Sequence, residues 1–169
     1  MKTKDLSEQQ LSEYFAEHVR YEVQMLLNVT SAILQQLQVP QGLQHAPVES
    51  YAIHLRNLIT FLYPSSSRDT DVCAKDFFIK EETWDKIRPR LSETLIKAKI
   101  RADKEVGHLT TSRQNGTPKG KEWDVKNLTE ELMPLIYLYC ESADKVRLGS
   151  LIDELLAFHS RVKALPARQ

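Results

Sequence analysis

Apolar residues recur at helical spacing along most of the chain. Between Leu11 and Leu37 they return every three or four residues, which is typical of one face of an α-helix held over many turns. Ser7 and Gln10 stand at capping-box spacing ahead of this stretch, and Pro40 and Gly42 follow it. The pattern predicts a long first helix that begins at Ser7 and ends before Pro40.

A second helix is expected from about Val48 to Leu62. Most of its apolar residues share one stripe, but Ile53 and Phe61 fall outside it. A helix that is apolar on more than one face usually lies centrally in a bundle. The polar residues inside this helix are therefore expected to need partners, and they are His54, Arg56 and Asn57.

The rest of the chain reads as shorter helices and loops. Asp69 is expected to cap a short helix within 71–78. Helix is expected over 81–110, either continuous or as two segments, because Pro89 suits the first turn of a helix that begins near Arg88. Core candidates of this region are Trp84, Ile87, Leu91, Leu95, Ala98 and Val106. Residues 111–121 are expected to form a loop. Pro134 should kink or interrupt a helix over 122–142. A last helix is expected over 143–165, before a frayed tail at about 165–169.

No segment alternates apolar and polar residues in the way that a strand requires. The prediction is an all-α protein, a single domain over residues 1–169 that forms a bundle of five or six helices. The 169 residues suffice for one sizeable core, and the hydrophobic content of 41% is ordinary for a globular domain.

The charge is balanced, with 23 basic and 23 acidic residues, so RNA binding would need a local patch. Basic residues do gather between 86 and 121: Lys86, Arg88, Arg90, Lys97, Lys99, Arg101, Lys104, Arg113, Lys119 and Lys121. Cys73 and Cys140 lack metal-ligand spacing and are expected to be reduced. The polar N-terminus and the absence of a long apolar run indicate a cytoplasmic protein without a membrane span.

Signatures of several enzyme classes are absent, among them the glycine-rich phosphate loops and the nucleophile elbow. A di-metal bundle needs Glu-x-x-His motifs on two facing helices, and the chain lacks such a pair. No metal and no cofactor are expected. Arginine and histidine remain: Arg101 and His108 are seven residues apart, which returns them to one helix face about 10 Å apart along the axis. Both side chains could then reach one phosphate.

The Arg-x6-His run "RADKEVGH" resembles the motif of the HEPN family (higher eukaryote and prokaryote nucleotide-binding), although Ala102 stands where a polar residue is commoner. The stretches "YAIHLRNLITFLYP", "DVCAKDF" and "GHLTTSR" are similar to uncharacterised bacterial helical proteins of this kind, over about residues 46–140. The family is commonly a helical bundle that forms homodimers. Many members are metal-independent RNA nucleases, and others are catalytically inert.

The resemblance implies cleavage by attack of the ribose 2′-hydroxyl on the adjacent phosphate. His108 would be the general base or acid, and Arg101 would stabilise charge on the phosphorane. His54, Arg56 and Asn57 would orient the substrate or that histidine. Arg113 and Lys119 would contact the RNA backbone.

A structural interpretation of the same residues stands beside the catalytic one. Arg101 pairs with Glu105 on its own helix, and His108 caps the helix end. His54 is then a core histidine bonded to a carbonyl, and Arg56 pairs with a carboxylate such as Asp71 or Asp76. On this interpretation the protein is a non-catalytic helical module for dimerisation or for binding another protein.

Overall fold

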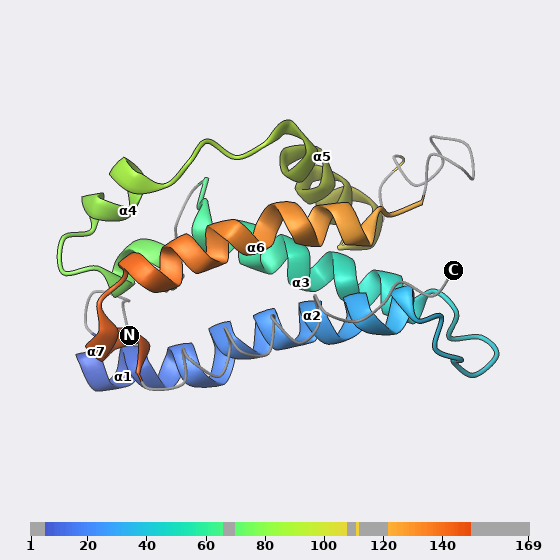
Figure 1. Ribbon diagram of the computed structural model, residues 1–169, viewed down its shortest axis with the longest axis horizontal. Helices are drawn as coiled ribbons and strands as arrows, with labels where there is room; N and C mark the ends of the chain where they lie inside the picture. The colour runs from blue at the N-terminus through green and yellow to red at the C-terminus, as the bar shows by residue number, and fades with distance from the viewer. Residues whose placement is uncertain (1–5, 66–69, 108–110, 112–121, 150–169) are drawn as a thin grey trace.

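The computed structural model describes residues 6–65, 70–107, 111 and 122–149, and within these ranges the chain forms helices and no strand. The all-α prediction is confirmed. The helices in chain order are α1 (Glu8–Tyr14), η2 (Phe15–Val19), α2 (Arg20–Leu34), α3 (Ala46–Leu62), η3 (Ala74–Phe77), α4 (Glu82–Ile87), α5 (Glu93–Arg101), η4 (Ala102–Val106), α6 (Val125–Ser142) and α7 (Lys145–Leu148). Figure 1 shows α2, α3 and α6 lying lengthwise, with α5 set against α3 and α6.

The long first helix is present as α1, η2 and α2 in unbroken succession. Its predicted start is confirmed, because Ser7 Oγ accepts from the Gln10 amide at 3.2 Å and Gln10 Oε1 accepts from the Ser7 amide at 2.9 Å. The sequence did not indicate that η2 is a π-helical turn, in which the Arg20 amide donates to the Phe15 carbonyl. Such turns are rare and occur often at functional sites.

The first helix ends at Leu34, several residues ahead of Pro40. Gln36 has a φ of +50°, its amide donates to the Ile33 carbonyl, and the Leu37 amide donates to the Ala32 carbonyl. This pair of hydrogen bonds around one left-handed residue is the Schellman motif, which satisfies the last carbonyls of a helix. Leu37 is consequently 58% exposed and not part of the core stripe.

Helix α3 is central, as its apolar pattern predicts. It packs against α2, α5, η3 and η4, and seven of its residues are buried. Tyr51 of α3 donates to the Val125 carbonyl at 3.1 Å, and its hydroxyl lies 3.1 Å from that of Thr129. The Thr129 hydroxyl in turn lies 3.0 Å from that of Thr30. Buried hydroxyl groups thus join α2, α3 and α6.

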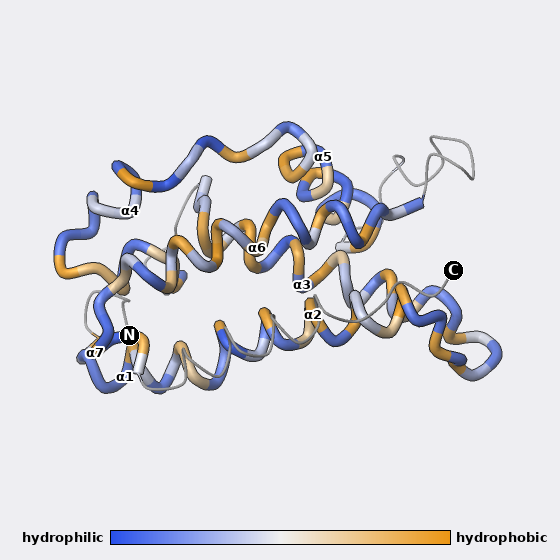
Figure 2. The backbone as a smooth tube through the Cα atoms, in the orientation of Figure 1, coloured by the Kyte–Doolittle hydropathy of each residue, from blue (hydrophilic) through white to orange (hydrophobic). Residues whose placement is uncertain are grey.

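One end of the core is aromatic. Tyr139 of α6 makes ring contacts with Phe61, Phe77, Phe78 and Trp84, at centroid distances from 5.3 to 6.3 Å. Trp84 is 1% exposed and donates through Nε1 to the Leu62 carbonyl, so its prediction as a core residue is confirmed. Figure 2 shows hydrophobic positions along the inward sides of the long helices.

The helix predicted to begin near Arg88 begins instead at Glu93. Ser92 caps it by accepting from the Leu95 amide at 3.2 Å, and Arg88, the residue before Pro89, has an extended backbone. Ile87 is 40% exposed, so it is not a core residue. Asp69 lies outside the described residues, and the cap of η3 is built by Asp76, which accepts from the Cys73 amide at 2.7 Å.

Two further predictions concern the C-terminal half. Pro134 does not interrupt α6. Because proline has no amide N–H, the carbonyl of Glu130, four residues earlier, loses its helical hydrogen bond. Both residues are exposed, so water has access to that carbonyl. Of the predicted last helix, the described residues include α7, which ends before Gly149. Gly149 has a φ of +73°, and a Cβ there would lie 2.5 Å from Ser12 Oγ. The remainder, 150–169, lies outside the described residues.

Two buried tyrosines differ in the hydrogen bonding of their hydroxyl groups, so replacing each by phenylalanine should affect stability differently. The hydroxyl of Tyr51 is hydrogen-bonded, whereas that of Tyr139 has no hydrogen-bond partner in the described structure. Tyr51→Phe should lower the free energy of unfolding by about 1 kcal/mol, and Tyr139→Phe should leave it unchanged or raise it by up to about 1 kcal/mol. Urea denaturation of both variants measures this difference, and a greater loss from Tyr139→Phe than from Tyr51→Phe would contradict it.

Candidate functional site

The residues predicted to carry chemistry lie on α3 and at the end of α5. His54, Arg56 and Asn57 belong to α3, and Arg101 is the last residue of α5. His108 and Arg113 lie outside the described residues, so the predicted meeting of Arg101 with His108 is untested.

Glu22 of α2 is the partner of two of the α3 residues. Its Oε2 lies 2.8 Å from Nδ1 of His54, and its oxygens accept from the amide of Asn57 at 3.2 and 3.3 Å. An ionised carboxylate only accepts hydrogen bonds, so Nδ1 of His54 carries a proton. His54 is 8% exposed and is therefore a satisfied core histidine, as the structural interpretation holds, although its partner is a carboxylate and not a carbonyl.

Arg56 forms an ion pair through Nε with Oδ1 of Asp103, in the π-helical turn η4. The partner is neither Asp71 nor Asp76, the two carboxylates named from the sequence. Lys99 donates to the other oxygen of Asp103 at 3.0 Å. Burial raises the pKa of Asp103, but the hydrogen bonds and charges of Arg56 and Lys99 outweigh it and hold the pKa below its usual value of 3.8.

These contacts form one continuous network across α2, α3 and the α5–η4 segment. Arg56 Nη1 lies 3.5 Å from Asn57 Oδ1, which closes the gap between the Glu22 contacts and the Asp103 contacts. We call this set the polar network, and its members are His54, Glu22, Asn57, Arg56, Asp103 and Lys99. The sequence segments "HLRN" and "RADKEV" are thus brought side by side at Arg56 and Asp103.

Arg101 lies on the other side of α5 from the polar network contacts. Its Nε donates to Glu105 at 2.8 Å, which confirms the predicted pairing within the helix. Nη1 donates to the carbonyl of Glu122 at 2.8 Å, and the guanidinium lies 4.5 Å from the centre of the Trp123 ring. Cation–π contact and carbonyl together tie the end of α5 to the residues just before α6. The sequence gives no signal for these contacts of Arg101 with Glu122 and Trp123, because Glu122 lies 21 residues further along the chain.

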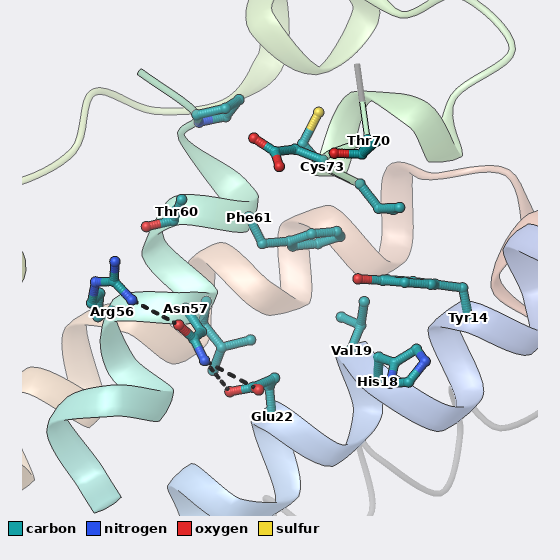
Figure 3. Close-up of a pocket in the computed structure, with 14 residues that line it drawn as sticks. Tyr14, His18, Val19, Glu22, Arg56, Asn57, Thr60, Phe61, Thr70 and Cys73 are labelled. Atoms are coloured by element: carbon teal, nitrogen blue, oxygen red, sulfur yellow. Dashed lines mark hydrogen bonds between the residues drawn. The ribbon is translucent and has the colours of Figure 1, made fainter. Parts of the chain in front are cut away.

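A pocket beside these residues lies between η2, α3 and the segment 70–73. Its volume is about 460 Å³. Figure 3 shows Phe61 in its middle, with Tyr14 and Glu22 extending toward it from the first helix. Arg56 and Asn57 contribute to the lining from α3. Of the predicted site residues, Arg56 and Asn57 line it, whereas His54 and Arg101 do not.

The side chains that the first helix contributes to this pocket were not predicted from the sequence. Tyr14, His18 and Glu22 follow one another at intervals of four, which is the only sequence signal for a shared face. Burial raises the pKa of the Tyr14 phenol, and the charges of Glu22 and Asp71 raise it further. The fields of both carboxylates therefore reach the same hydroxyl.

Most of the basic residues between 86 and 101 are paired locally. Five of the six have a carboxylate within 4.0 Å, three or four residues away in the chain, and these are Lys86, Arg88, Lys97, Lys99 and Arg101. Local carboxylates thus offset the charge of these five residues, while Arg90 is exposed and Arg113, Lys119 and Lys121 lie outside the described residues.

Neither a metal cluster nor a membrane span is found in the part of the chain that the structure describes. No group of three or more His, Cys, Asp or Glu side chains there is placed to hold a metal ion. The one Glu-x-x-His spacing of the sequence runs from Glu105 to His108, and Arg101 binds that glutamate. None of these helices combines the length and the apolar content that crossing a bilayer requires. Comparison of the chain with protein-family models, with curated proteins and with solved structures finds no match.

The ion pair of Asp103 should make part of the stability depend on pH. Because the folded state lowers the pKa of Asp103, this contribution is present above pH 3.8 and is lost as the pH falls through the lower folded value. Asp103→Asn should cost about 1 kcal/mol at pH 7 and clearly less near pH 3. Urea denaturation at the two pH values measures the difference, with Glu93→Gln, in an exposed pair, as the control. An equal cost at both values would contradict it.

Proposed function

We propose that this chain is a HEPN-like protein that binds RNA and cleaves it without a metal ion, at the end of α5. Arg101 and His108 are the residues that carry the chemistry. Arg113, in the following segment, contacts the RNA backbone, and the protein acts as a homodimer. The observation that supports this best is the ion pair of Arg56 with Asp103, because it brings together the two segments on which the family resemblance rests.

In the proposed reaction, His108 takes the proton of the ribose 2′-hydroxyl while the 2′-oxygen attacks the adjacent phosphorus. The bond from phosphorus to the 5′-oxygen breaks, and that oxygen leaves with a proton from an acid or from water. The products are a 2′,3′-cyclic phosphate and a 5′-hydroxyl. Arg101 stabilises the negative charge that develops on the phosphorane oxygens.

His54, Arg56 and Asn57 have a supporting role in this proposal and do not contact substrate. Each already has a partner within the chain, Glu22 or Asp103, and both carboxylates would repel a phosphate. Through Asp103, Arg56 fixes the turn that leads from Arg101 toward His108. The α3 residues thereby fix the position of η4, the turn that precedes His108 in the sequence.

The catalytic assignment is tested by His108→Ala on a 5′-labelled single-stranded RNA in the presence of EDTA. Wild-type protein should release fragments that end in a cyclic phosphate, and the variant should cleave at least about 100-fold more slowly because its general base is gone. His45→Ala is the matched control, because His45 is exposed and its side chain makes no capping bond at α3. Cleavage by His108→Ala at the wild-type rate would refute the assignment.

A second candidate is a non-catalytic helical module that associates with a partner or with itself. It is favoured by the finding that His54, Arg56, Asn57 and Arg101 are all bound internally. Exposed apolar side chains also occur where α2 leads into α3, at Leu34, Leu37, Val39 and Leu43. The RNA assay separates the candidates: a folded wild-type protein that associates in sedimentation experiments but leaves RNA intact belongs to the second class.

A further inference from the structure

The carboxylates and the guanidinium that line the pocket beside η2 already have partners within the chain. Glu22 accepts hydrogen bonds from His54 and Asn57. Arg56 is held by its ion pair with the turn η4, and Asp71 likewise has an interaction within the chain. A charged ligand would have to compete with these contacts, so the pocket is better suited to a neutral molecule.

The hydroxyl group of Tyr14 is available to such a ligand. Among the described residues no group is hydrogen-bonded to it. Figure 3 shows it pointing to the side of the pocket where Phe61 lies. The ring that carries it is in contact with His18, at a centroid distance of 4.6 Å. A phenol can both donate and accept a hydrogen bond, so this group can hold a polar atom of a neutral ligand.

The electrostatic field at the Tyr14 hydroxyl selects the kind of polar atom. Burial raises the pKa of this phenol, and the negative charges of Glu22 and Asp71 raise it further. The phenol therefore keeps its proton, and the potential around it is negative. Such a potential favours the positive hydrogen of an N–H or O–H group over a negatively charged group.

The middle of the pocket is suited to an aromatic ring. Phe61 lies there, with Val19, Leu58 and Val72 around it, and aromatic rings pack well against one another. A small apolar void of about 10 Å³ is lined by Val19, Leu58 and Phe61 as well, so Phe61 separates it from the pocket. This space lets the Phe61 ring adjust when a second ring packs against it. The pocket volume of about 460 Å³ falls in the range of sites for small molecules.

The backbone on the Tyr14 side of the pocket is also unusual. Tyr14 directly precedes the π-helical turn η2, and His18 and Val19 lie within that turn. Turns of this kind occur often at functional sites. The irregular backbone thus coincides with the wall that carries the available hydroxyl.

We propose that this pocket binds a small neutral aromatic molecule with an N–H or O–H group, its ring against Phe61 and its hydrogen donated to the Tyr14 hydroxyl. Indoles and phenols belong to this class. No charged side chain of the lining has to give up its partner when such a molecule binds. Arg101 does not line the pocket, so the proposal is independent of the proposed RNA cleavage.

Indole is the probe, because it joins one N–H group to an uncharged aromatic body. An NMR titration should give saturable binding, with a dissociation constant on the order of 0.1 to 1 mM for a ligand of this size. Benzofuran has the same fused rings with an oxygen in place of the N–H group, and it should bind roughly fivefold more weakly, for the loss of one neutral hydrogen bond. No saturable binding of indole, or equal binding of benzofuran, would overturn the proposal.

Variants of two aromatic residues locate the site. Tyr14→Phe should weaken indole binding roughly fivefold and leave the affinity for benzofuran unchanged, because only the hydroxyl is lost. Phe61→Leu should weaken the binding of both probes, because the aromatic contact is lost. Tyr21→Phe is the matched control, since Tyr21 is 50% exposed and does not line the pocket.

Tyr14→Phe removes a hydroxyl that no described residue bonds, so it keeps the test valid even if Phe61→Leu unfolds the protein. Unchanged indole affinity in Tyr14→Phe, or an equal loss in Tyr21→Phe, would refute the assignment. His108→Ala should bind indole as wild type does, which separates this site from the proposed RNA site.

Discussion

The structure depends on how a central helix satisfies polar side chains that its position buries or partly buries. Helix α3 packs against α2 on one side and against α5 and η4 on the other, and carries His54, Arg56 and Asn57 in its middle. Polar groups so placed are costly without partners. Glu22 and Asp103 supply them from the two flanking segments, so the polar network also fixes where those segments lie.

The polar network divides the neighbouring surface into two regions with different chemistry. On one side, Glu22 contributes its carboxylate to a pocket with aromatic walls. On the other, Asp103 holds the turn that follows Arg101, while Trp123 and the Glu122 carbonyl, just before α6, fix that arginine. A single set of contacts thereby borders both the pocket and the proposed RNA site.

Apolar periodicity predicted the elements that are long and regular. The start of the first helix at Ser7, the extent and central position of α3, and the burial of Trp84 all follow from local patterns. The pattern did not reveal the early stop at Gln36, because a residue other than glycine rarely adopts a positive φ. Nor did it reveal the π-turn at Phe15–Val19, since apolar spacing is nearly the same in both kinds of helix.

The candidate site was predictable as a need for partners but not as a set of pairs. Sequence indicated that His54 and Arg56 require partners, yet Glu22 and Asp103 are 32 and 47 residues away from them. Local spacing carries no information on such pairs. Arg101 and Glu105, by contrast, are only four residues apart, and their pairing was predicted correctly.

Arg56 and Asp103 stabilise the fold through each other. A double-mutant cycle with Arg56→Met and Asp103→Asn, measured by urea denaturation at pH 7, isolates that coupling from the other effects of each change. We expect a favourable coupling energy of about 1 kcal/mol. Costs that simply add, with a coupling of zero, would show that the two side chains stabilise the protein independently and would contradict it.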